Sequence, residues 1–278
     1  MNRSRTLLLP ALFLLVPLRW YVKQFDTEAD TGFFVQINWV VWLFLILTVA
    51  CLLFFALDRL LHKRLERVGV AHPLLLGVVA AGAGLVVAAG SIRELLWGNL
   101  SQQPLLLLQP IFGVLTGLML VTVAVQLFIR GCVRLNLWLT LPPVIWQAFA
   151  VIQKYVNNSV SLYIFDYVAE IFMVCAFWVF WIAHSRLMGE YDEEHKAYSM
   201  AVFFGCCAGL LGLVLAIPQC LVPSSVNMGQ WELYSTIALS CYAVAFVLSV
   251  KGARQPRHSL RPLPEEDDSS GRGEVSST

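Results

Sequence analysis

The chain has 278 residues, of which 58% are hydrophobic and 13% charged, and its mean hydropathy is +0.71. This composition excludes a water-soluble domain of this size. The formal net charge of +1 gives no electrostatic reason to expect a nucleic-acid partner. We therefore expect an integral membrane protein, with the lipid bilayer as its surroundings.

Long apolar segments recur along the chain, separated by short polar ones. A helix needs roughly 17 to 25 apolar residues to cross the hydrocarbon layer. We count eight such segments, at residues 6 to 22, 34 to 57, 71 to 92, 105 to 129, 136 to 154, 161 to 183, 199 to 220 and 231 to 250. Unbroken apolar segments of this length predict helices and not barrel strands. The fold class that we predict is all-α, a polytopic bundle of about eight transmembrane helices.

The first segment follows Arg3 and Arg5 and is also similar to a secretory signal. A cleaved signal would continue with small residues, but residues 19 to 23 read Arg-Trp-Tyr-Val-Lys. Aromatic and cationic side chains of this kind anchor helices in the headgroup layer. We predict an uncleaved first helix that ends in an interfacial anchor.

The distribution of lysine and arginine predicts the orientation. With the N-terminus in the cytoplasm, 15 of the 19 cations fall in cytoplasmic segments, and only Arg19, Lys23, Arg93 and Lys154 fall outside. The positive-inside rule therefore predicts that both termini are cytoplasmic. The predicted location is the plasma membrane or an inner membrane.

Between the second and third segments, Asp58 to Val70 places leucines near one helical face and cations elsewhere. This pattern predicts a helical extension that lies along the membrane surface. Its cations are Arg59, Lys63, Arg64 and Arg67. They either bind anionic lipid, at about 1 kcal/mol each, or only enforce the topology.

Two further polar regions lack the pattern of a binding site. Residues 190 to 196 contain four acidic residues without metal-site spacing, so we expect neither a metal nor another cofactor. Residues 254 to 278 are rich in proline, acidic residues, serine and glycine and have too few apolar residues to pack. We predict a membrane bundle over residues 1 to 253 followed by a disordered cytoplasmic tail.

Small residues mark helices that are expected to approach closely. Gly113 and Gly117 are four residues apart, and glycine and alanine are dense in the third segment between Gly77 and Gly90. Such faces let helix axes pack at short distance in a membrane. We predict an intimate bundle around these segments.

The sixth segment contains two carboxylates. Glu170 is expected near the middle of the bilayer, where a charge costs roughly 2.5 to 3.5 kcal/mol. Tyr163, Asp166, Tyr167 and Glu170 follow the spacing i, i+3, i+4, i+7, so they form one polar stripe on a helix face. A stripe of this kind must face protein or water.

An antiparallel hairpin of the fifth and sixth segments places Gln147 level with this stripe and Lys154 within reach of Asp166. One interpretation is a substrate-binding set that lines an outward-opening cavity: Glu170, Asp166, Gln147, Lys154, Tyr163 and Tyr167, with Gln109 or Gln126 as further candidates. The other is structural, with a buried Asp166 to Lys154 pair and a protonated Glu170 hydrogen-bonded to a neighbouring helix.

The sequence contains no HExxH, GxSxG, P-loop or aspartate-rich diphosphate motif, which disfavours an enzyme. Two classes of function remain. The first is a small transporter or permease that uses the stripe to bind a small solute or ion. The second is a non-catalytic membrane sensor or assembly subunit, whose protein partner the sequence does not identify.

Overall fold

The computed structural model describes residues 3–28, 32–35, 37–61, 67–97, 104–133, 135–158, 165–189, 197–222 and 228–253. In these ranges the chain forms eight helices and one pair of short strands. The helices are α1 (Arg3–Phe25), α2 (Trp39–Leu61), α3 (Pro73–Trp97), α4 (Pro104–Arg130), α5 (Leu137–Asn158), α6 (Phe165–Met188), α7 (Ala197–Leu221) and α8 (Gln230–Ser249). The strands are β1 (Arg67–Val70) and β2 (Val250–Ala253). The predicted all-α class is confirmed.

Seven of these helices are long and apolar enough to cross a membrane, namely all except α5. The chain is a multi-pass membrane protein. The fifth predicted span does form a helix, but α5 contains Pro142, Pro143, Gln147, Gln153 and Lys154, which lower its apolarity. Seven spans are therefore supported by length and hydropathy, one fewer than the sequence predicted.

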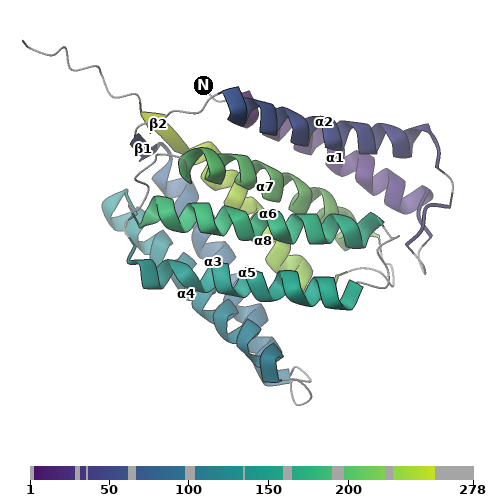
Figure 1. The fold of residues 1–278 in the computed structure, drawn as a ribbon. Helices are drawn as coiled ribbons and strands as arrows, with labels where there is room; N and C mark the ends of the chain where they lie inside the picture. The colour runs from purple at the N-terminus through teal and green to yellow at the C-terminus, as the bar shows by residue number, and fades with distance from the viewer. Residues whose placement is uncertain are drawn as a thin grey trace, which may run out of the picture.

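The helix α7 lies at the centre of the bundle. It packs against α6, α8, α1 and α2, and 78% of its apolar window is buried, compared with 28% for α2. In Figure 1, α1 and α2 run together along one side, and α4 lies on the opposite side. Buried aromatic side chains of α6 and α8 meet in the core, where the Trp181 ring stacks on the Tyr242 ring.

The predicted close approach of small-residue helices is confirmed between α3 and α4. A Cβ on Gly117 would lie 2.6 Å from the carbonyl oxygen of Gly84, and a Cβ on Gly84 would lie 2.7 Å from that of Gly117. Neither position has room for a side chain. The two backbones therefore touch directly, as small residues in membrane helices allow.

The predicted surface helix up to Val70 is wrong for its last residues. The helix α2 ends at Leu61, and Arg67–Val70 forms β1, which pairs antiparallel with β2 so that Val70 lies opposite Val250. The partner strand lies about 180 residues further along the chain, so the local helical pattern contained no sign of it.

Of the four predicted lipid-binding cations, Lys63 and Arg64 lie outside the described residues, as does the side chain of Arg67. The Arg59 guanidinium lies over the rings of Phe203 and Phe204 on α7, 5.4 and 5.7 Å from their centroids. Lipid binding by these four cations stays a prediction. The predicted tail also lies outside the described residues, and β2 ends at Ala253, where that tail was expected to begin.

Candidate functional site

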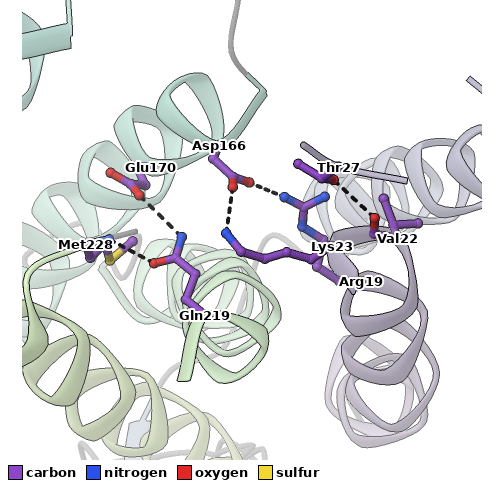
Figure 2. Close-up of polar contacts among 8 residues, drawn as sticks. All are labelled: Arg19, Val22, Lys23, Thr27, Asp166, Glu170, Gln219 and Met228. Atoms are coloured by element: carbon purple, nitrogen blue, oxygen red, sulfur yellow. Dashed lines mark hydrogen bonds and ion pairs between the residues drawn. The ribbon is translucent and has the colours of Figure 1, made fainter. Parts of the chain in front are cut away.

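A cluster of buried charges joins α1 to the first turn of α6. The Asp166 carboxylate accepts hydrogen bonds from the Arg19 guanidinium and from Lys23 Nζ, the second at 3.0 Å (Figure 2). All three residues are buried, with exposed fractions of 2% for Asp166, 2% for Arg19 and 4% for Lys23. One carboxylate therefore holds two cations away from water.

This cluster corrects the predicted interfacial anchor at the end of α1. Trp20 and Tyr21 are exposed, as expected of anchor residues, but Arg19 and Lys23 point into the protein. The two cations are four residues apart and share one helix face, and that face meets α6. The Arg19 guanidinium also lies over the Phe44 and Phe165 rings, 5.5 and 5.1 Å from their centroids. Aromatic faces of this kind attract cations.

Glu170 lies one turn further along α6 and is 1% exposed. It accepts a hydrogen bond from Lys154 Nζ at 2.8 Å and a longer one from Gln219 Nε2 at 3.5 Å. Gln219 Oε1 in turn accepts from the Met228 backbone N–H at 3.1 Å. Figure 2 shows Asp166 pointing toward α1 and Glu170 toward Gln219 of α7.

Lys154 is shared between two carboxylates. Its Nζ lies 2.8 Å from Glu170 Oε2 and 2.7 Å from Glu232 Oε1. The Lys154 side chain is 17% exposed and that of Glu232 45%, so the pair with Glu232 is partly solvated. The structural interpretation of the sequence expected Lys154 beside Asp166. The structure instead pairs Lys154 with Glu170, because Arg19 and Lys23 occupy Asp166.

A cavity of about 240 Å³ opens beside Lys154, between α3, α4, α5, α6 and α8. Its larger polar side chains are Glu94, Gln109, Gln147, Gln153, Lys154 and Glu232. The rings of Trp146, Phe177 and Trp231 supply apolar surface. Polar and apolar groups line the cavity in nearly equal measure, so it is more polar than most small-molecule sites, whose walls are predominantly apolar.

Gln147 is the most enclosed amide of this cavity. It is 5% exposed, and its Oε1 has no hydrogen-bond partner among the described residues. A buried acceptor without a partner costs roughly 1 to 3 kcal/mol. Most buried polar groups in proteins are satisfied, so this oxygen is an acceptor that a water molecule or a ligand with a hydrogen-bond donor would satisfy.

The structure separates the predicted substrate-binding residues. Gln147 and Lys154 line the cavity, and Glu170 contacts it through Lys154. Asp166 faces α1 and is not in the lining, and neither is the half-buried Tyr167. Tyr163 lies outside the described residues.

Sequence reasoning placed Gln109 among the candidates, and Gln109 does line the cavity, unlike Gln126. It missed Glu94 and Glu232. Both lie within a few residues of a helix end, Glu94 near the C-terminus of α3 and Glu232 near the N-terminus of α8, at the edges of the predicted spans. The sequence contained one signal for them, the neighbouring Trp231 and Trp97, and that signal equally fits a membrane interface.

Comparisons with protein-family models, curated proteins and solved structures found no match. In the part of the chain that the structure describes, no three His, Cys, Asp or Glu side chains come together to hold a metal ion.

Proposed function

We propose that this chain is a small-solute transporter or permease and that its solute binds in the cavity beside Lys154. The observation that carries this proposal is a charged, amide-rich cavity lined by five helices of a largely apolar bundle. Charges inside a membrane bundle cost free energy, and those that persist there commonly serve solute or ion pathways.

In this proposal all eight helices cross the membrane, both termini are cytoplasmic, and the cavity lies in the outer half of the bundle. The cation distribution supports this orientation. The solute then enters from outside and meets Lys154 and Glu232 before it reaches the core.

The ion pairs connect the cavity to the rest of the bundle. Lys154 contacts the half-exposed Glu232 on one side and the buried Glu170 on the other. Glu170 in turn contacts Gln219 on α7, the central helix. A solute that competes for Glu232 or Lys154 changes the balance between these two pairs. This gives the cavity a direct electrostatic connection to α6 and α7.

The test is flux through the purified full chain in proteoliposomes. Solutes are first selected by their ability to raise the melting temperature of the detergent-solubilised protein, and uptake of each is then measured with and without a proton or cation gradient. We expect uptake by the parent and its loss in Glu170→Gln, which keeps the size and one hydrogen-bonding group but removes the charge.

Glu28→Gln is the control, because it makes the same chemical change at an exposed position that neither lines the cavity nor pairs with Lys154. It should transport like the parent. A Glu170→Gln protein as active as the parent would show that transport does not depend on the charge of Glu170. If the parent and both variants bind the solute but none of them transports it, the sensor or assembly-subunit function is favoured instead.

A further inference from the structure

The acidic side chains of the cavity outnumber its cations. Glu94 from α3 and Glu232 from α8 both line it and repel each other electrostatically. Lys154 is already held by Glu170 and Glu232. Among the described residues, Glu94 has neither an ion pair nor a hydrogen bond. The cavity therefore presents a carboxylate that no cation of the described chain neutralises.

The formal charge around the cavity is negative. The lining holds Lys154, Glu94 and Glu232, a formal −1 when all are ionised, and Glu170, which pairs with Lys154 from outside the lining, makes it −2. The Arg93 guanidinium lies 5.6 Å from the centroid of the Trp231 ring and is not in the lining. With Arg93 the formal charge is −1. A negative cavity with low-dielectric walls attracts cations and repels anions.

The enclosed amide adds a requirement for a hydrogen-bond donor. Gln147 lines the cavity, and its Oε1 is a buried acceptor without a partner in the described part of the chain. An ionised carboxylate accepts hydrogen bonds only, so the exposed Glu94 presents acceptors to a ligand that carries donors. A ligand that carries N–H groups on a cationic centre satisfies both.

The apolar walls fit the organic part of such a ligand. Trp146 and Trp231 line the same cavity, and indole faces are the strongest side-chain partners for cations. A bare metal ion would leave these rings unused, and among the described residues no carboxylate cluster is arranged to hold one.

On the assumption that the cavity is the solute site of the proposed function, we infer that its ligand is a small organic ammonium ion with N–H donors. The ammonium lies between Glu94 and Gln147, and its carbon chain lies against the indole rings. Glu94 supplies the negative charge that attracts the ammonium ion. Gln147 accepts a hydrogen bond from its N–H group and so favours it over a quaternary cation, which has no N–H.

Four probes test this inference on the full chain in nanodiscs by calorimetry and thermal shift. They are butylammonium, tetramethylammonium as a cation without N–H, butyramide as a neutral N–H donor, and butyrate as an anion. We expect butylammonium to bind best, tetramethylammonium about tenfold more weakly for its missing hydrogen bonds, and butyrate not at all.

Two cavity variants and one control locate the site. Glu94→Gln should weaken the binding of both cations by about tenfold or more. The control, Glu28→Gln, should leave the affinity for both cations unchanged. Gln147→Leu should erase the preference for butylammonium over tetramethylammonium. If a variant fails to fold, the ranking of the four probes on the parent protein still decides.

Equal or tighter binding of butyrate or butyramide by the parent would overturn the inference. The inference would also be overturned if the protein bound and transported another solute but did not bind butylammonium. The proposed transport function would then still stand. Conversely, butylammonium binding in the expected order without flux in proteoliposomes would support the ligand class and refute transport.

Discussion

Within the buried cluster of Arg19, Lys23 and Asp166, neutralising Asp166 should destabilise the bundle more than removing either cation. The substitution Asp166→Asn keeps the side-chain shape but leaves Arg19 and Lys23 buried without the carboxylate that binds both. Breaking a buried ion pair by removing one partner costs about 3 to 5 kcal/mol. Glu170 still acts on Lys23 through space, which keeps the expected loss within that range.

Lys23→Met provides the matched comparison. It also removes one charge from the same cluster, but it leaves Arg19 and Asp166 as a neutral pair. A flexible apolar side chain then replaces the lysine stem. We expect a change in the free energy of unfolding of no more than about 1 kcal/mol in either direction.

The double variant completes a thermodynamic cycle. In Asp166→Asn with Lys23→Met only Arg19 is left uncompensated, so the double variant should be more stable than Asp166→Asn alone. This recovery follows only if Lys23 and Asp166 interact directly, as their 3.0 Å contact indicates.

The assay is thermal unfolding of the detergent-solubilised protein, followed by tryptophan fluorescence. For a chain of 150 to 250 residues, 1 kcal/mol corresponds to about 2 to 4 °C in melting temperature. Asp166→Asn should therefore melt roughly 6 to 20 °C below the parent. An Asp166→Asn protein at least as stable as Lys23→Met would refute the assigned pairing of α1 with α6.

Three further predictions test the packing, the cavity and the topology. Gly117→Leu should lower stability by about 1 to 3 kcal/mol through overpacking, whereas Gly82→Ala, where the added Cβ meets no atom within 4 Å, should be neutral or stabilising; equal melting temperatures would contradict the close approach of α3 and α4. Gln147→Leu should raise the melting temperature, because it removes a buried acceptor without a partner, and a drop would show that the amide is satisfied. In a cysteine-free background, Asp30→Cys should react with an impermeant maleimide on intact cells and His195→Cys only after permeabilisation; external labelling at residue 195 would reverse the orientation.

The positions of the helices could be predicted because the membrane imposes a length on apolar segments. The first span, expected at residues 6 to 22, is the helix Arg3–Phe25, and the last, expected at 231 to 250, is Gln230–Ser249. The observed α1 is longer because its polar end residues continue the helix beyond the apolar run. Hydropathy detects the hydrocarbon-facing part of a helix and not its cap.

The site could be predicted only where it depends on neighbours in sequence. Helices α5 and α6 are consecutive in the sequence and pack against each other, so the proximity of Lys154 to the carboxylates of α6 could be predicted. The contacts of Asp166 with α1 and of Lys154 with α8 depend on which distant helices pack against this pair. No local pattern in the sequence encodes that choice, and the same holds for the pairing of β1 with β2.

The two ion clusters of α6 carry opposite excess charge, which explains why the helix holds both. The cluster of Arg19, Lys23 and Asp166 has a formal +1, and the cluster of Lys154, Glu170 and Glu232 has a formal −1. Asp166 and Glu170 are four residues apart, or about 6 Å along the helix axis. The clusters therefore attract each other across one turn, and Glu170 acts on Lys23 at this range.

The attraction between the two clusters predicts that Glu170→Gln, the variant of the transport test, also loses stability. Glu170→Gln removes the excess negative charge, so the α1 cluster loses its through-space partner while its direct contacts remain. Its melting temperature should fall, but by less than that of Asp166→Asn. Glu232→Gln makes the same change in charge at a half-exposed position, where water screens it, and should cost less still. If the three variants lose stability equally, the clusters do not interact through α6. If only Glu170→Gln loses flux while its melting temperature stays near that of Glu232→Gln, the transport defect is not a folding defect.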